Sequence, residues 1–488
     1  MLSAIGFGGF LSVYHTFLQF ILVILLIIDL AKVSTLFDLI KLEASTMFIF
    51  SFIILILVGA LLLMLPEMTT DHLGSDWMTA IFTSTSASCV TGLIVVDTAT
   101  YFTFKGQLVI MALIQLGGLN IISFATFFAS LYSKGLGIKH HSMMQDFFSS
   151  GSLFDAKALL RQIIYMTVFI EGVGTIVIFS LWDPAINFSS FGQKFFYSIF
   201  HAISAFNNAG FSLFTNNLFE PVLKNSYMLH LTIAGMIFFG SLGFSTIRDI
   251  FGIGSMRERM RLPWKKYHLS TQISLYSSVI LIVFGAAVFY WIEKDNVLAN
   301  QMTFEAGITS IFQSVTCRTA GFNTVDMALL KAPTLILMVF LMFIGASSGS
   351  TGGGIKTSTF TLIIVSAIAT LRGKKNLELF KHNIAWELLN KAFTIFIFSA
   401  SFVFVATFFL AVLEPGKDIL KLLFEEVSAF GTVGLSTGIT ADMSTTSKYI
   451  LIASMFVGRV GTLTLGFALS KKVITKAYKY PNAHFMIG

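Results

Sequence analysis

Charged residues are scarce in this sequence. They make up 12% of its 488 residues, whereas 55% are hydrophobic and the mean hydropathy is +0.82. A soluble protein of this length surrounds its cores with a charged surface, so that class is excluded. Several windows of about 20 residues, the length that an α-helix needs to cross a bilayer, have few or no charges: 48–65, 108–132, 163–181, 275–291 and 392–413. The sequence predicts a polytopic helical membrane protein, because lipid offers the backbone no hydrogen-bond partners.

Cysteine is also rare. Cys89 and Cys317 cannot form a disulfide framework. The first residues lack a basic segment, so a cleaved signal peptide is not expected. The nine histidines form no HExxH or comparable metal-ligand spacing. An intramembrane protease would need an Asp pair, a Ser/His pair or zinc ligands, and the sequence has no such arrangement. We therefore expect neither an enzyme nor a cofactor in this chain.

The basic residues lie in particular connections between apolar segments. The net charge of +7 could suggest a nucleic acid partner, but this placement indicates membrane topology instead. The basic clusters are Arg257, Arg259, Arg261, Lys265 and Lys266; Arg372, Lys374, Lys375 and Lys381; and Lys471, Lys472, Lys476 and Lys479. The other connections are mainly acidic, through Glu67, Asp71, Asp76, Asp183, Glu293, Asp295, Glu414 and Asp418. The positive-inside rule places the basic connections and the C-terminus in the cytoplasm.

A glycine-containing polar stretch occurs four times. The copies are SASCVTGL (86–93), SAFNNAGF (204–211), SVTCRTAGF (314–322) and SAFGTVGL (428–435). Their last glycines, Gly92, Gly210, Gly321 and Gly434, are 118, 111 and 113 residues apart. In three copies a serine lies six residues and a phenylalanine ten residues before the glycine, whereas Ser314 lies seven before it. Near-periodic copies of this kind predict an internal repeat.

Each copy has the same surroundings. A spanning segment leads to an acidic linker and then to an apolar segment too short to cross a bilayer: 77–86, 194–204, 304–314 or 419–428. These read as re-entrant pore helices, because non-helical backbone at membrane depth must be buried in protein or line water. We expect an all-α membrane protein with four M1–pore helix–M2 repeats around a central pore, plus an N-terminal apolar helix. The predicted parts are the N-terminal segment 1–45, repeats at 46–133, 160–253, 270–370 and 388–475, and a cytoplasmic tail 476–488.

The four stretches contain no Asp or Glu. A cation passing them would be coordinated by backbone carbonyls, which replace its hydration shell. Glycine permits the positive φ that lets successive carbonyls point to one axis. Carbonyl rings of this kind suit K⁺. The predicted ion-binding residues are Val90, Thr91, Gly92, Asn208, Ala209, Gly210, Thr319, Ala320, Gly321, Thr432, Val433 and Gly434.

The segment GASSGSTGGGIKTS (345–358) interrupts the second helix of the third repeat. So many glycines make a continuous helix improbable. We predict an intramembrane gate below the filter, carried by Gly345, Gly349, Gly352, Gly353, Gly354 and Lys356. The alternatives are a flexible kink or a loop at the cytoplasmic end. A phosphate-binding loop lacks the strand, the helix and the Walker spacing that it would need.

Four further residues carry charge near these segments. Arg459 lies within an apolar run and is predicted to raise a barrier to cations below the filter. Alternatively, carbonyls or an acid such as Glu425 or Glu426 neutralise it. Arg318 is expected to brace the third turn. Asp97 and Asp326 follow their filters, either as helix caps or as groups that attract cations.

The whole plan resembles the Trk/Ktr/HKT superfamily of potassium transporters, and most of all its bacterial KtrB and TrkH membrane subunits. Besides the four stretches, the resemblance is carried by SVTCRTAGFNTVD (314–326), GASSGSTGGGIKT (345–357) and VGRVGTLTL (457–465), and it covers about residues 45–475. It implies one filter per chain, K⁺ as substrate, pairing as homodimers in the cell membrane, and a cytoplasmic nucleotide-binding regulatory subunit (KtrA- or TrkA-like) as partner.

Departures from the family pattern bear on the details. Cys317 stands where the family pattern has proline, and residues 10–28 supply at most one extra helix, so the subfamily stays open. Na⁺-selective relatives replace the first filter glycine by serine, and Gly92 therefore favours K⁺. The alternatives are a Na⁺-conducting or Na⁺-coupled member of the superfamily and an alternating-access secondary transporter, although the latter usually has twofold repeats.

Overall fold

The computed structural model describes residues 44–119, 156–374, 376–462 and 465–466. The chain divides into two units, Met1–Met47 and Phe48–Gly488, and the account below concerns the second. The predicted N-terminal apolar helix, residues 120–133 and 467–475 of the first and fourth repeats, and the predicted tail 476–488 lie outside the described residues. The predicted domain boundaries stay predictions.

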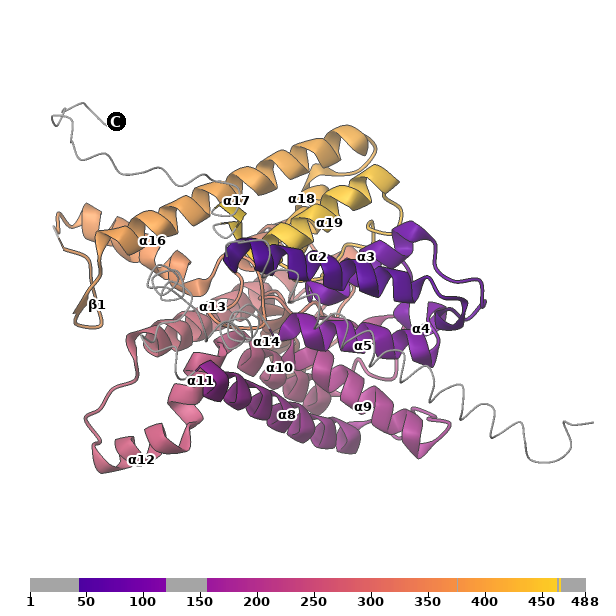
Figure 1. Ribbon diagram of the computed structural model, residues 1–488, viewed down its shortest axis with the longest axis horizontal. Coiled ribbons are helices and arrows are strands. Elements are labelled where there is room, and N and C mark those ends of the chain that lie inside the picture. Colours follow the sequence, from indigo (N-terminus) through magenta and orange to yellow (C-terminus); the bar gives the residue numbers. More distant parts are fainter. Residues whose placement is uncertain (1–43, 120–155, 375, 463–464, 467–488) are drawn as a thin grey trace, which may run out of the picture. The chain divides into compact units, whose positions relative to one another are not determined.

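The described residues are almost entirely helical (Figure 1). Grouped by repeat, the main helices are, in chain order, α2 (Ala44–Leu63), α3 (Trp77–Ser88), α5 (Phe104–Gly118); α8 (Ala156–Leu181), α9 (Phe191–Phe206), α10 (Tyr227–Leu242), α11 (Phe244–Phe251); α13 (Leu269–Glu293), α14 (Thr303–Thr316), α15 (Ala332–Phe343), α16 (Thr357–Leu371); α17 (Trp386–Leu413), α18 (Ile419–Phe430), α19 (Thr445–Val460). The connections contain α4 (Thr98–Tyr101), α12 (Ile253–Arg261), three 3₁₀ turns, η1 (Pro66–Met68), η3 (Asn217–Phe219) and η4 (Met327–Leu329), and one hairpin, β1 (Glu378–Leu379) with β2 (His382–Asn383).

Several helices have the length and apolarity of a membrane span. In the described residues Arg161–Leu181, Leu269–Glu293 and Trp386–Leu413 are long enough by themselves, and Tyr227–Leu242 with Phe244–Phe251 forms a pair bent by 103°. Shorter apolar helices cover Phe48–Leu63, Phe104–Gly118, Ala332–Phe343 and Thr357–Leu371. With the apolar composition of the chain, these helices define an all-α polytopic membrane protein.

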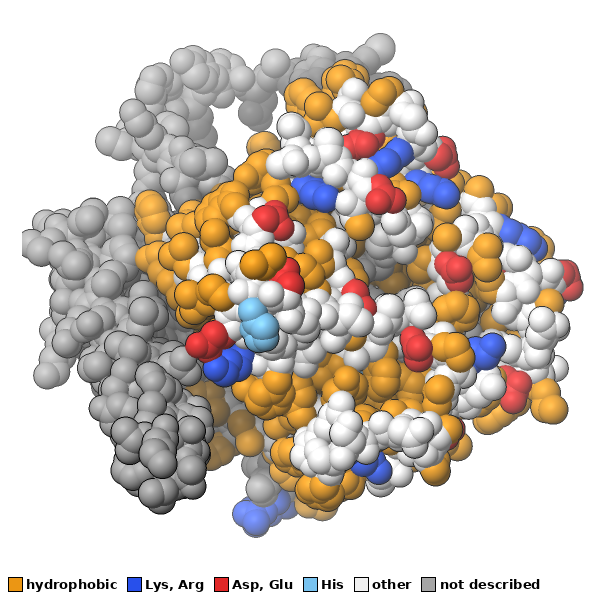
Figure 2. Space-filling view, turned by 90° about the vertical axis from the view of Figure 1, so that its right-hand side faces the viewer, with side chains coloured by type: hydrophobic (Ala, Val, Ile, Leu, Met, Phe, Trp, Pro, Cys, Tyr) orange, Lys and Arg blue, Asp and Glu red, His pale blue; other side chains and the backbone are white. Residues whose placement is uncertain are grey.

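The outward surfaces of the long helices are apolar. On α8, Phe169 and Ile176 are 70% and 71% exposed, and on α17 Phe404 is 73% exposed. Figure 2 faces the right-hand side of Figure 1, an end of the helices, and there charged side chains are dispersed among hydrophobic ones. Exposed apolar surface of this extent is expected where lipid, not water, covers a protein.

The four pore helices α3, α9, α14 and α18 are 12 to 16 residues long. At 1.5 Å per residue they reach about 18–24 Å, less than the roughly 30 Å of a bilayer core. Side-chain caps start three of them, since Asp76, Ser190 and Asp418 accept hydrogen bonds from backbone N–H groups of the first turn. In α14, Glu305 instead accepts from the N–H of Met302 at 3.0 Å.

The helices close into a ring. Within each repeat the pore helix contacts one or both of its flanking helices, as in the pairs α3–α5, α8–α9, α13–α14 and α18–α19. Between repeats, each pore helix contacts the second helix of the repeat before it: α9 on α5, α14 on α10, α18 on α15, and α3 on α19. Because the last contact joins the fourth repeat to the first, the four pore helices surround one common centre.

Within the described residues, the second helices of repeats two and three are not straight. The second helix of repeat three is interrupted between α15 and α16, as the sequence predicts. The sequence analysis did not predict the bend in repeat two, where α10 ends at Gly243 with φ +87° and α11 starts in a new direction. A side chain is strained at that φ, so the glycine of the motif SLGF is the signal that could have identified the bend.

Candidate functional site

The four repeat glycines lie together. An ideal Cβ on any of them would lie 3.0–3.2 Å from the Cα of the next: Gly92 beside Gly210, Gly210 beside Gly321, Gly321 beside Gly434, and Gly434 beside Gly92. The same Cβ would clash with the carbonyl oxygen that precedes the neighbouring glycine, which belongs to Ala209, Ala320, Val433 or Thr91. The glycines therefore form a closed ring too tight for any side chain, and four equivalent carbonyls lie at it.

Each turn repeats one backbone pattern. The glycines have φ of +69° to +91°, and the residues two positions earlier, Val90, Asn208, Thr319 and Thr432, also have positive φ. The residue between them does not. Positive φ is strained for β-branched residues, and such strain persists only where the surroundings impose it, typically at functional sites. Alternation in the sign of φ turns successive carbonyls toward the same side of the chain.

A hydroxyl at the end of each pore helix holds its turn. Ser86 Oγ accepts from the N–H of Gly92 at 3.0 Å, and Ser428 Oγ accepts from that of Gly434 at 3.1 Å. Ser204 Oγ donates to the carbonyl of Phe211 at 2.7 Å. In the third turn the sequence comparison of the repeats needs a correction. Thr316 Oγ1 donates to the carbonyl of Phe322 at 2.7 Å, so Thr316 and not Ser314 is the equivalent of the serine in the other turns.

Ser314 has another role in the third repeat. Its Oγ donates to the carbonyl of Ile282 on α13 at 2.8 Å, as Ser84 Oγ donates to Ile56 on α2 at 2.6 Å. The third turn is therefore one residue shorter than the others. With this register Phe312, which is buried, matches the phenylalanine of the other three pore helices.

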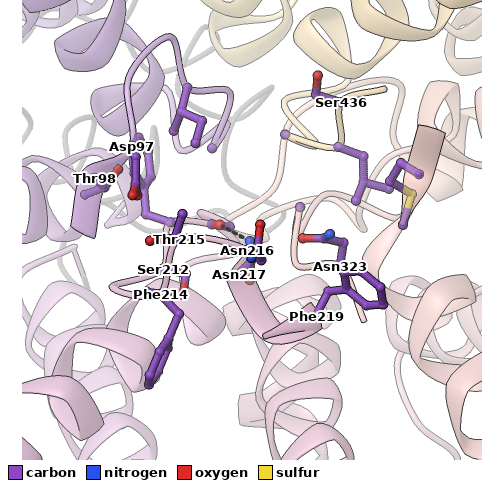
Figure 3. A pocket seen from close by; sticks show the side chains of 18 of the residues that line it. Asp97, Thr98, Ser212, Phe214, Thr215, Asn216, Asn217, Phe219, Asn323 and Ser436 are labelled. Atoms are coloured by element: carbon purple, nitrogen blue, oxygen red, sulfur yellow. Dashed lines mark hydrogen bonds between the residues drawn. The ribbon is translucent and has the colours of Figure 1, made fainter. Parts of the chain in front are cut away.

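The glycine ring forms the floor of a cavity of about 290 Å³. Its walls carry carboxylates, amides and hydroxyls from the segments that follow the four turns (Figure 3). Asp97 and Asp326 both line it, and both also cap short helices by accepting from the N–H groups of Ala99 and Ala328. The two interpretations of these aspartates, as caps and as cavity residues, are therefore compatible. We call this cavity the vestibule.

The glycine-rich loop between α15 and α16 (residues 344–356) lies against the turns of three repeats. The N–H of Gly353 donates to Thr432 Oγ1 at 3.0 Å. Thr351 Oγ1 lies 3.1 Å from the side-chain amide of Asn208. A Cβ on Gly352 would clash with the hydroxyl of Thr319. Three successive loop residues therefore contact three turns, which argues against a loop at the cytoplasmic end.

The remaining predicted gate residues stabilise the conformation of this loop. Gly345 lies so close to Gly353 that a Cβ would overlap its carbonyl oxygen. Gly349 and Gly354 have φ of +73° and +67°. Lys356 Nζ donates to the carbonyl of Gly352 at 2.5 Å, inside the loop.

Arg459 joins this loop to the first repeat. Its guanidinium donates to the carbonyls of Thr351 and Gly117, and the side chain is buried. In the described residues Arg459 pairs with neither Glu425 nor Glu426. Of the two predicted alternatives, an acid or backbone carbonyls, the structure therefore has carbonyls as its partners. The arginine therefore contacts the same loop that lies against the turns.

Arg318 points away from the ring. It is 2% exposed and donates to the carbonyl and the hydroxyl of Ser278 on α13, at 3.3 and 3.1 Å. The third turn is thus tied to its own first helix. Cys89 and Cys317, at the ends of their pore helices, are buried free thiols.

Sequence reasoning did not find the role of Glu425. This buried carboxylate of α18 accepts from Ser436 Oγ at 2.9 Å, from the N–H and Oγ1 of Thr437 at 2.7 and 3.0 Å, and from Thr440 Oγ1 at 2.6 Å. These bonds fix the segment that leaves the fourth turn. A glutamate within an apolar pore helix, eleven residues before a run of Ser, Thr and Gly, was the available signal.

A ring of four re-entrant backbone turns within a polytopic helical protein, with a loop against it, defines the class of ion-conducting membrane proteins. A solved structure with this fold is the potassium transporter TrkH from Vibrio parahaemolyticus. The superposition covers 88% of this chain and 86% of the TrkH chain, with a TM-score of 0.67 and 20% sequence identity.

The TrkH family model, described as cation transport protein, matches residues 15–478. The chain belongs to this family, and it is a cation transporter and not an enzyme. Similar relatives are the Ktr system potassium uptake protein B of Bacillus subtilis, 37% identical over 439 residues (90% of this chain, 95% of the relative), and that of Vibrio alginolyticus, 34% identical over 440 residues (90% and 93%). A third is the potassium/sodium uptake protein NtpJ of Enterococcus hirae, 33% identical over 443 residues (90% and 95%).

Proposed function

We propose that this protein takes up K⁺ through a selectivity filter made of the four turns 90–92, 208–210, 319–321 and 432–434. The closed glycine ring, with four carbonyls at equivalent positions, carries this proposal. The sequences of the four turns contain no carboxylate, so backbone oxygens are the available ligands. Carbonyl oxygens can replace the water that a K⁺ ion sheds. The names of two relatives above, both potassium uptake proteins, agree with it.

In this mechanism a hydrated cation enters the vestibule and loses water at the glycine ring. The residues Val90, Asn208, Thr319 and Thr432, with positive φ, hold the backbone in a strained form before any ion arrives. Carbonyls that are already oriented need little reorganisation when they bind the ion. The ends of the pore helices, where the carbonyl ends of the helix dipoles lie, add a favourable potential for a cation.

The glycine-rich loop acts as the gate in this proposal. It contacts the side chains of the second, third and fourth turns, so an ion leaving the filter meets it next. Gly345, Gly349, Gly352, Gly353, Gly354 and Lys356 belong to this gate. Arg459 holds it through the carbonyl of Thr351 and adds a positive barrier. Displacing the loop would break a few hydrogen bonds of ordinary strength, a cost that a regulatory partner could supply.

The partners belong to the same proposal. We infer a homodimer in the inner membrane with its C-terminus in the cytoplasm, regulated by a separate cytoplasmic nucleotide-binding subunit. The basic connections predicted to face the cytoplasm offer such a subunit a surface. The names of two relatives assign them to a Ktr system, which supports a transporter with further components.

Ion flux into liposomes tests the function. The purified full chain should take up Rb⁺, and external K⁺ should compete with this uptake far better than Na⁺ or Li⁺. Equal competition by Na⁺ would favour the second candidate, a transporter that also carries Na⁺, for which the name of the Enterococcus hirae relative is the specific observation. No uptake above that of empty liposomes, with or without the regulatory subunit, would contradict both.

A further inference from the structure

One filter turn receives a hydrogen bond from a vestibule side chain. Asn217 Nδ2 donates to the carbonyl oxygen of Gly210 at 3.2 Å. Both residues line the vestibule, and Figure 3 shows Asn217 near its middle, with Asn216 beside it. The glycine carbonyl of the second turn therefore already has a partner on the side from which ions arrive.

The other three repeats have no equivalent. Across the part of the chain that the structure describes, the carbonyls of Gly92, Gly321 and Gly434 accept no hydrogen bond. The four carbonyls of the glycine ring thus differ: three are free to face an ion, and one is shared with an amide. A ring built from four unequal repeats has its largest chemical difference at this position.

The local backbone holds Asn217 in place. Its φ is +56°, a region that Asn tolerates better than most residues. Its N–H donates to the carbonyl of Phe214 at 3.0 Å, and its Oδ1 accepts from the N–H of Leu218 at 2.9 Å. With both ends of the side-chain amide engaged, Nδ2 is directed at Gly210 and cannot rotate away at low cost.

We propose that Asn217 is a specificity-determining residue, which weakens and immobilises the Gly210 carbonyl and so disfavours Na⁺ relative to K⁺. A carbonyl that accepts a hydrogen bond offers an ion less negative potential, and a strong field at a site favours the smaller cation. A fixed carbonyl also cannot move inward to contact Na⁺. Both effects favour K⁺ over Na⁺. This inference rests on the proposed K⁺ uptake through the filter.

Two variants remove the donor by different routes. Asn217→Asp keeps the side-chain shape, the tolerance of positive φ and the acceptor for Leu218, but it cannot donate to Gly210. Asn217→Gly keeps the backbone conformation and removes the side chain without adding charge. Asn216→Asp is the matched control, because it adds the same charge to the same vestibule and no hydrogen bond from its side chain to a filter carbonyl is described.

The readout is the concentration of K⁺ and of Na⁺ that halves Rb⁺ uptake in liposomes. In both Asn217 variants the preference for K⁺ over Na⁺ should fall by about threefold to tenfold, the factor that one ordinary hydrogen bond is worth, while Asn216→Asp keeps the wild-type ratio. An unchanged ratio in both Asn217 variants would overturn the inference. So would an equal fall in Asn216→Asp without a fall in Asn217→Gly, because added charge alone would then explain the loss of preference. Failure of the wild type to take up Rb⁺ would instead contradict the proposed function.

Discussion

Thr432, in the fourth filter turn, accepts a hydrogen bond of 3.0 Å from the backbone N–H of Gly353 in the glycine-rich loop. The turn proposed to bind the ion and the loop proposed to gate it are thus joined directly. Thr351 makes a comparable link to Asn208 of the second turn. A change in a filter side chain should therefore alter gating as well as ion binding.

Thr432→Val tests this link. Valine keeps the shape but cannot accept the hydrogen bond, and Val90 already occupies the equivalent position with φ +58°. We expect Rb⁺ uptake to rise about twofold to tenfold, because one hydrogen bond that favours the closed loop is lost. The control is Thr91→Val, since the buried Thr91 hydroxyl has no partner within the described residues. An equal rise in both variants would contradict a specific role of the Thr432–Gly353 bond.

Arg459→Ala should raise K⁺ flux, because it removes both the positive charge and the contact with the loop. We expect about a tenfold rise, which corresponds to a barrier lower by about 1.4 kcal/mol. Arg459→Lys keeps the charge and should stay near the wild type, whereas Arg459→Gln should behave like the alanine variant. Flux in liposomes is the measurement. Unchanged or lower flux in Arg459→Ala, with a normal elution profile of the purified protein, would refute the barrier.

Gly434→Ser should impair the preference for K⁺ over Na⁺ by about tenfold or more. The residue has φ +91°, and an added Cβ would lie 3.0 Å from the Cα of Gly92 and overlap the carbonyl oxygen of Thr91. Strain at positive φ costs about 1–3 kcal/mol, and here it falls on the ring itself. Gly438→Ser is a matched control, with φ +90° and nothing within 4 Å of its Cβ. Competition of K⁺ and Na⁺ with Rb⁺ uptake measures both. Intact discrimination in Gly434→Ser would remove the fourth turn from the filter.

Glu414, which follows α17, gives a prediction about pH. Burial raises the pKa of its carboxyl, but the N–H of Ser444, the hydroxyls of Ser447 and Ser444, and Lys417 outweigh burial and lower the pKa from 4.5 to about 2. A carboxyl with a lowered pKa stabilises the fold above its unfolded pKa, and that contribution is lost as the pH falls through the folded value. The thermal midpoint should therefore decrease between about pH 4.5 and pH 2.

Glu414→Gln should have a lower thermal midpoint than the wild type at pH 6 and a weaker dependence on pH below about 4.5. Intrinsic fluorescence during heating measures both. Glu387→Gln, at the exposed start of the same helix, should keep the pH dependence of the wild type. Identical curves for the wild type and Glu414→Gln would contradict the stabilising role of the carboxylate.

The sequence by itself determined the class of protein and predicted the four polar turns. Apolar windows of bilayer length define spanning helices from composition alone, and four polar glycine stretches after short apolar segments identify re-entrant turns. The glycine-rich interruption between α15 and α16 was equally visible, because glycine acts on the backbone locally. Such signals need no knowledge of the neighbours.

Only the tertiary structure decided which atoms meet. It placed Thr316 and not Ser314 in the third turn, directed Arg459 to two carbonyls instead of an acid, gave Glu425 four donors, and brought Asn217 to Gly210. The closure of the ring also depends on the contact of α19 with α3, which are far apart in the chain. The physical reason is that hydrogen bonds and close backbone contacts depend on distance in space, and hydropathy and spacing along a single chain do not encode which repeats become neighbours.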